Sequence, residues 1–109
     1  MTVISLHERY PNIAALLAAI AQRLQMFLGH KSIFTLSAFI SGIGFAEQFY
    51  AIQKPMVALD TFETWVSASH NPQQLALDSF GLAAHWSETA EDGFDLWFSW
   101  FNTFRTCHK

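Results

Sequence analysis

The stretch Ser32–Tyr50, SIFTLSAFISGIGFAEQFY, decides the fold of this chain. On a helix at about 100° per residue, its large apolar side chains fall on nearly every side, and only Ser37 and Ser41 mark a narrow polar strip. The fifteen uncharged residues before Glu47 are fewer than the roughly 18 to 20 needed to cross a bilayer. The pattern therefore predicts a central core helix over residues 32–50, wrapped by the other elements of an all-α bundle of about five helices.

The composition of the 109 residues favours one folded domain with a core of large rings. Hydrophobic residues make up 51% and aromatic residues 16%, including eleven phenylalanines and four tryptophans. Charged residues are only 14%, which excludes a disordered chain and leaves a thinly charged surface. We expect a single domain over residues 1–109, which is long enough to bury a core without disulfides or metals.

The cysteine content and the first residues indicate a cytoplasmic protein. Cys107 is the only cysteine, so a disulfide within the chain and a cysteine-based zinc site are excluded. The opening MTVISLHERY lacks the basic start, apolar run and small-residue cleavage site of a signal peptide. We expect a cytoplasmic location and no membrane partner.

The net charge of −3 conceals an uneven distribution of charged residues. Residues 55–104 contain seven acids and no lysine or arginine. This acidic half has the wrong sign for a phosphate backbone, so we expect no nucleic-acid partner; it suits a basic protein attracted by electrostatic steering. An ordinary solvated face is the alternative explanation. The seven acids are Asp60, Glu63, Asp78, Glu88, Glu91, Asp92 and Asp95.

Two helices flank the central one on its N-terminal and C-terminal sides. Apolar residues at spacings of three and four predict the first from about Pro11 to Gln25, after which Gly29 is expected to form a left-handed turn. Asp60 is expected to cap the next one, with Glu63 as the reciprocal partner of a capping box. Ser32 is expected to cap the central helix itself.

Two further helices complete the expected bundle. Asn71 and Pro72 are expected to end the helix that Asp60 begins and to open a fourth, which continues toward Trp86. Thr89 is expected to cap a fifth helix, with Asp92 returning the hydrogen bond. The apolar arc of this last helix covers about 200°, more than a bundle helix needs. Trp100 is therefore expected to be either tucked under the N-terminal arm or exposed for a partner.

No catalytic, cofactor or metal site is predicted. The five histidines are scattered without a second ligand at helical spacing, and no G-x-S-x-G turn is present. Gly42 and Gly44 fall within helical periodicity, so we interpret them as notches for a neighbouring helix and not as a phosphate-binding loop. Caps and solvated faces explain the carboxylate clusters, and we expect that the protein is not an enzyme.

Part of the chain resembles small bacterial immunity proteins encoded beside polymorphic toxins. Their pattern reads I-x-x-R-P-x-M-Y-L-G, then S-x-x-x-L-x-x-F-I-x-G-Y-x-x-A, and later F-x-x-W-V, which Phe62, Trp65 and Val66 resemble. Leu24, Phe27 and Ile43 depart from it, standing for a proline, a tyrosine and an aromatic residue. The matching positions of the first two segments are Arg23, Met26, Leu28, Gly29, Ser32, Leu36, Phe39, Ile40, Gly42 and Ala46.

The resemblance implies an immunity protein of a contact-dependent growth inhibition or related toxin system. Such a protein binds its cognate toxin and neutralises it, and we expect a basic ribonuclease as the toxin and a monomer or a 1:1 heterodimer as the assembly. The expected contacts are drawn from the seven acids, with Trp86 or Trp100 as a buried anchor. The alternative is a helical regulatory module whose Phe/Trp core encloses a small apolar ligand.

Overall fold

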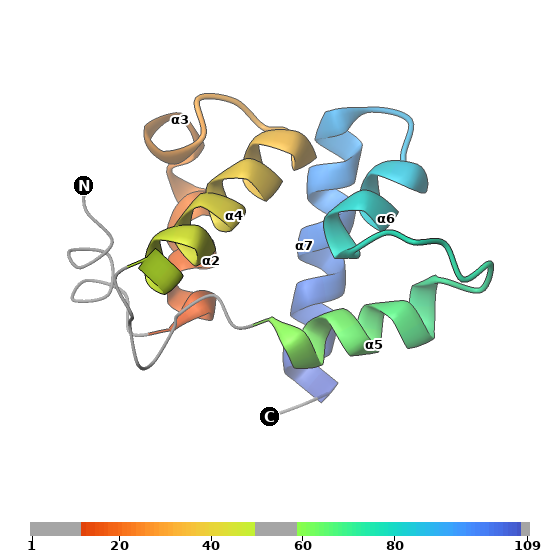
Figure 1. The fold of residues 1–109 in the computed structure, drawn as a ribbon. Helices are drawn as coiled ribbons and strands as arrows, with labels where there is room; N and C mark the ends of the chain where they lie inside the picture. Colours follow the sequence, from red (N-terminus) through yellow and green to blue (C-terminus); the bar gives the residue numbers. More distant parts are fainter. Residues whose placement is uncertain (1–11, 50–58, 108–109) are drawn as a thin grey trace. The chain divides into compact units, whose positions relative to one another are not determined.

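The computed structural model describes residues 12–49 and 59–107 (Figure 1). Within these residues the chain forms six α-helices and no strand, which confirms the predicted all-α class. The helices are α2 (Ile13–Gln22), α3 (Leu24–Phe27), α4 (Ile33–Phe49), α5 (Asp60–His70), α6 (Ser79–His85) and α7 (Ala90–Cys107).

The described helices belong to two compact units. The first unit contains α2, α3 and the part of α4 from Ser37 onward. The second unit contains Lys31–Leu36, which includes the first turn of α4, together with α5, α6 and α7. The expectation of a single domain over residues 1–109 stays a prediction.

The predicted first helix is divided in two at Arg23. Helix α2 begins after Asn12, whose side-chain Oδ1 accepts a hydrogen bond of 2.9 Å from the N–H of Ala15. Arg23 leaves helical geometry, with φ −131° and ψ 54°, and α3 follows as one short turn. Gly29 has φ 80°, which confirms the predicted left-handed turn. Pro11, expected in the first turn, lies outside the described residues.

Helix α4 is capped as predicted but is not wrapped on every side. The Ser32 hydroxyl accepts a hydrogen bond of 3.1 Å from the N–H of Phe34. One face of the helix is buried, whereas Phe34, Phe45 and Phe49 are 65%, 71% and 73% exposed. The expectation that other elements enclose the whole helix is therefore wrong, because hydropathy measures what a side chain prefers and not whether a neighbour reaches it. The buried residues of α4 include Ile33, Leu36, Ile40 and Ile43.

Gly42 does not serve as a notch for another described helix of the same chain. It lies on the exposed side of α4, and a Cβ added there would meet no other atom within 4 Å among the described residues. That part of the interpretation is wrong. The role expected for Gly44, which is half-buried, stays a prediction.

The core of the second unit is a cluster of aromatic rings from α5, α6 and α7. Trp97 of α7 is fully buried and stacks on Phe80 of α6, with 4.9 Å between ring centroids. Phe62 of α5 meets Trp97 and Phe101 edge-on, each at 5.3 Å. Such pairs contribute about 0.5–1.5 kcal/mol each beyond the area they bury, so the three helices are held together chiefly by rings.

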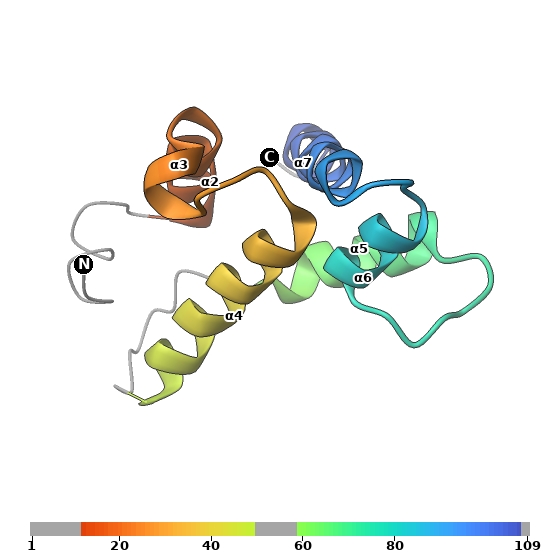
Figure 2. The same cartoon turned by 90° about the horizontal axis from the view of Figure 1, so that it is seen from above.

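The α5–α6 connection is an ordered loop where the sequence predicted helix. The Asn71 side chain accepts from the N–H of Leu75 and donates to its carbonyl, both at 2.9 Å. Gln74 has φ 55°, which no helix adopts. Helix α6 begins after Asp78, whose carboxylate accepts from the N–H of Gly81 at 2.8 Å. The predicted start of this helix near Pro72 is therefore wrong, since α6 begins at Ser79. Figure 2 shows the loop extending away from α5 before it returns to α6.

Candidate partner-binding surface

Four exposed carboxylates mark the start of α7, and we call them the α7 acidic end: Glu88, Glu91, Asp92 and Asp95. The first turn of α7 is capped by Thr89, whose hydroxyl accepts a hydrogen bond of 3.0 Å from the N–H of Asp92, as predicted. Free N–H groups and the helix dipole make this end electropositive, so carboxylates are stabilised there. Local helix chemistry thus explains why acids are tolerated at this density.

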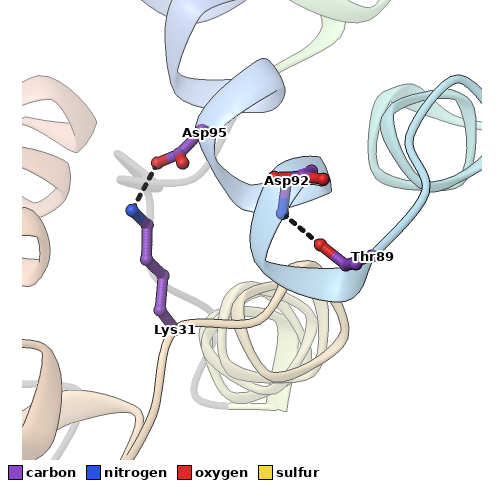
Figure 3. Close-up of polar contacts among 4 residues, drawn as sticks. All are labelled: Lys31, Thr89, Asp92 and Asp95. Carbon is purple, nitrogen blue, oxygen red and sulfur yellow. Dashed lines mark hydrogen bonds and ion pairs between the residues drawn. The ribbon is translucent and has the colours of Figure 1, made fainter.

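Lys31 joins the α7 acidic end through an ion pair. Its Nζ lies 2.7 Å from Oδ1 of Asp95, and the side chains are 31% and 58% exposed (Figure 3). The same ammonium lies 5.9 Å from the ring centroid of Phe94. The hydrogen bond to Asp95 raises the pKa of Lys31, and the nearby charges of Glu91 and Asp92 act in the same direction. The acidic half of the sequence is therefore partly neutralised by a lysine from the preceding half.

Three members of the α7 acidic end differ from Asp95, which pairs directly with Lys31. In the part of the chain that the structure describes, Glu88, Glu91 and Asp92 make no ion pair. All three are exposed. Lys31 acts on Glu91 and Asp92 only at longer range than on Asp95, so the three carboxylates stay exposed to solvent without a direct ion pair among the described residues.

The two candidate tryptophans differ in exposure. Trp86, which follows α6 directly, is 47% exposed and its indole N–H donates to the carbonyl of His70 at 3.1 Å. Trp100 is 6% exposed and stacks on the His70 ring, with 4.5 Å between centroids. The alternative that Trp100 is exposed for a partner is wrong, because α5 ends against it. Trp86 is the indole at the surface, two residues before Glu88.

Glu63 makes a bond between helices instead of capping its own. Its carboxylate accepts from the N–H of Ser79 at 2.7 Å and from the Ser79 hydroxyl at 2.5 Å. The indole N–H of Trp97 donates to the same hydroxyl at 2.8 Å. Burial raises the pKa of Glu63, while the Ser79 hydrogen bonds oppose that rise. The predicted capping box is wrong: Leu59 occupies the cap position of α5, and Asp60 is its first helical residue.

The seven predicted acids do not form one cluster. Asp60 and Asp78 lie near Glu63, and both raise its pKa by charge repulsion. Three acids of the α7 acidic end, namely Glu91, Asp92 and Asp95, instead raise the pKa of Lys31, and Asp95 pairs with it directly. The first group is tied to the starts of α5 and α6, where Asp78 and Glu63 are occupied by helix N–H groups. Glu88, Glu91 and Asp92 are the larger set of carboxylates with no such internal role.

The described residues offer no cluster suited to a metal ion. Among residues 12–49 and 59–107, no three histidine, cysteine or acidic side chains converge. His70 lies between Trp100 and the edge of Trp65, and burial lowers its pKa. His85 is exposed and meets the edge of the Trp86 ring at 4.8 Å. These two imidazoles pack against tryptophans.

Comparison with known proteins adds no relative. No family model, no curated protein sequence and no solved structure matches the chain. Each helix in the described part of the chain is too short or too polar to traverse a lipid bilayer.

Sequence reasoning missed two features of the surface. Lys31 is far from Asp95 in the chain, and no local pattern links a lone lysine before α4 to an acid on α7. The exposed phenylalanines of α4 carry the same hydropathy as its buried residues, so periodicity could not separate them. A helix with apolar residues on all sides does indicate that each side favours burial, so the sequence pattern could have suggested that one face of α4 needs a partner.

Proposed function

We propose that this protein is a non-enzymatic inhibitor that binds a cognate toxin, a basic ribonuclease, through the α7 acidic end. The observation that carries the proposal is the exposed segment in which Trp86 is followed by Glu88, Glu91 and Asp92, three carboxylates without an ion pair among the described residues. Tryptophan is enriched among the residues that dominate binding energy, and surrounding acids speed association with a basic partner.

The chemistry of a ribonuclease fits this surface. An enzyme that cleaves RNA presents cationic side chains to the phosphate backbone. Carboxylates placed on those cations compete with RNA for the same site, so one contact supplies both attraction and inhibition. We expect a 1:1 complex in the cytoplasm, where RNA is the substrate to be protected.

Co-purification with the product of the neighbouring gene tests the proposal. The complex is expected to suppress RNA cleavage by that protein and to weaken as salt rises. At low salt, Asp92→Asn is expected to raise the dissociation constant about three- to tenfold, and Trp86→Ala by about tenfold or more.

Asp60→Asn is the matched control. It removes the same charge from an exposed acid in the first turn of another helix, and it is expected to change the dissociation constant less than about twofold. A dissociation constant that changes neither with salt nor with Asp92→Asn overturns the proposal. An equal loss of affinity in Asp92→Asn and Asp60→Asn overturns it too. Absence of any complex overturns it as well.

A further inference from the structure

The exposed side of α4 is a continuous apolar face. Helix α4 is one regular helix, so its residues at spacings of three and four share a side. Phe34 and Phe45 are 65% and 71% exposed at the two ends of a group of small residues, and Phe49 is 73% exposed one turn beyond Phe45. The small residues between the rings, all exposed, are Ala38, Ser41 and Gly42. No charged residue lies on this helix before Glu47.

This face is complementary to itself. An antiparallel pair of α4 helices, related by a twofold axis between Ser41 and Gly42, places Phe34 opposite Phe49 of the second copy. In the same register Ala38 lies opposite Phe45 of the second copy, so a large ring meets a small side chain. At the axis only a serine and a glycine meet, which allows the two backbones to approach closely. A twofold axis closes the assembly at two copies.

We propose that the free protein forms a homodimer through the antiparallel pairing of its α4 faces. A charge-free face gains nothing from a charged partner, and two copies of it bring no like charges together. The open space at Gly42, where a Cβ meets no atom within 4 Å of the described residues, is the room that the second helix occupies. This assembly replaces the monomer expected for the free protein and uses a different helix from the α7 acidic end.

The size of the face predicts a weak and reversible dimer. A phenylalanine buries about 150–250 Å² when fully enclosed. The three rings are 65%, 71% and 73% exposed, so the area still to be buried is roughly 300–500 Å² per copy. The total for two copies lies at the lower end of specific interfaces, where weak complexes are found. We expect a dissociation constant on the order of 10–100 μM.

Sedimentation equilibrium from low micromolar to near-millimolar concentration tests the dimer. The expected result is a mass that rises from one copy to two with concentration. Phe45→Ser is expected to weaken the dimer at least about tenfold, because each residue of a twofold interface is lost twice. A single-copy mass at every concentration overturns the proposal, as does a mass that passes two.

Gly42→Ala separates dimerisation from folding. Alanine favours the helix over glycine, and the site has room for a Cβ, so the variant is expected to raise the melting temperature while weakening the dimer several-fold. In a Cys107→Ser background, oxidised Gly42→Cys is expected to form a covalent dimer near the axis. Ala38→Cys is the control, because its counterpart lies about 10 Å away along the helix. Equal cross-linking of the two variants, or a dimer that Gly42→Ala does not weaken, overturns the pairing.

Discussion

The carboxylate of Glu63 on α5 accepts two hydrogen bonds from Ser79, one from its backbone N–H at 2.7 Å and one from its hydroxyl at 2.5 Å. Ser79 is the first residue of α6 and is fully buried, so a side chain of one helix completes the start of another. The Ser79 hydroxyl also accepts from Trp97 of α7. Ser79 thus links α6 to Glu63 of α5 and to Trp97 of α7.

Removal of this carboxylate is expected to destabilise the fold. Glu63→Ala leaves the N–H and hydroxyl of the buried Ser79 without their acceptor, and an unsatisfied buried polar group costs about 1–3 kcal/mol. We expect the free energy of unfolding to fall by about 2 kcal/mol in urea denaturation. Asp60→Asn, on the exposed start of the same helix, is expected to change it by less than about 0.5 kcal/mol. Equal effects of the two substitutions would refute the role of Ser79.

The same carboxyl group makes stability depend on pH in mild acid. Burial raises the pKa of Glu63 above its ordinary value of 4.5, so the folded protein holds this proton more tightly than the unfolded chain. The part of its stability that is linked to this proton is fully present below pH 4.5 and is lost as the pH rises through the folded-state pKa, whereas the hydrogen bonds to Ser79 remain. The unfolding free energy of wild type minus that of Glu63→Gln is expected to decrease from acid to about pH 7, because only the wild type has this carboxyl group to ionise. Urea titrations across this range measure it, and an increasing difference contradicts the assignment.

The effect of His70 on the pH dependence of stability has the opposite sign. Burial between tryptophans lowers its pKa from 6.5, so the folded state disfavours its protonation. The stability that the neutral ring contributes is present above pH 6.5 and is lost as the pH falls through that value toward the folded-state pKa. His70→Phe keeps a ring on Trp100 and removes the titration. Thermal melts should show wild type losing stability relative to this variant on acidification; parallel curves would contradict the prediction.

Gly93 lies in a close contact where an added Cβ would be crowded. A Cβ there would lie 3.0 Å from Cγ2 and 3.2 Å from Cβ of Ile33, which is 1% exposed and therefore has little free space to shift into. Overpacking costs about 1–3 kcal/mol, and replacing glycine in a helix returns about 1 kcal/mol. Gly93→Ala is expected to lower the unfolding free energy by about 1 kcal/mol net. Gly42→Ala, in open space, should raise it in the same assay, and a gain at both positions would show that Ile33 yields.

Lys31 is expected to compete with the proposed basic toxin for Asp95. The ion pair of 2.7 Å is exposed, so its loss is expected to leave the melting temperature nearly unchanged. Lys31→Gln adds a net negative charge to the α7 acidic end and is expected to tighten binding of the proposed basic toxin about two- to threefold at low salt. Titration calorimetry at two salt concentrations measures this gain. Weaker binding in Lys31→Gln would mean that the lysine itself contacts the partner.

The sequence by itself determined the features that depend on neighbours a few residues apart. Ser32 and Thr89 cap their helices with hydroxyls two or three residues from the bonded N–H, and Gly29 takes the left-handed turn. The all-α class follows from apolar residues at spacings of three and four, which local geometry places on one side of a helix. The acids were equally visible, because charge is a property of composition.

Only the tertiary structure decided which of these residues are buried, paired or exposed. Glu63 bonds Ser79 across helices, Lys31 reaches Asp95, and His70 covers Trp100 while Trp86 stays at the surface. Each of these outcomes depends on where distant segments meet, and helical periodicity carries no information about that distance. A phenylalanine on α4 has the same hydropathy whether it is buried or exposed, because hydropathy is a property of the residue type. Whether another segment covers the ring depends on the tertiary structure.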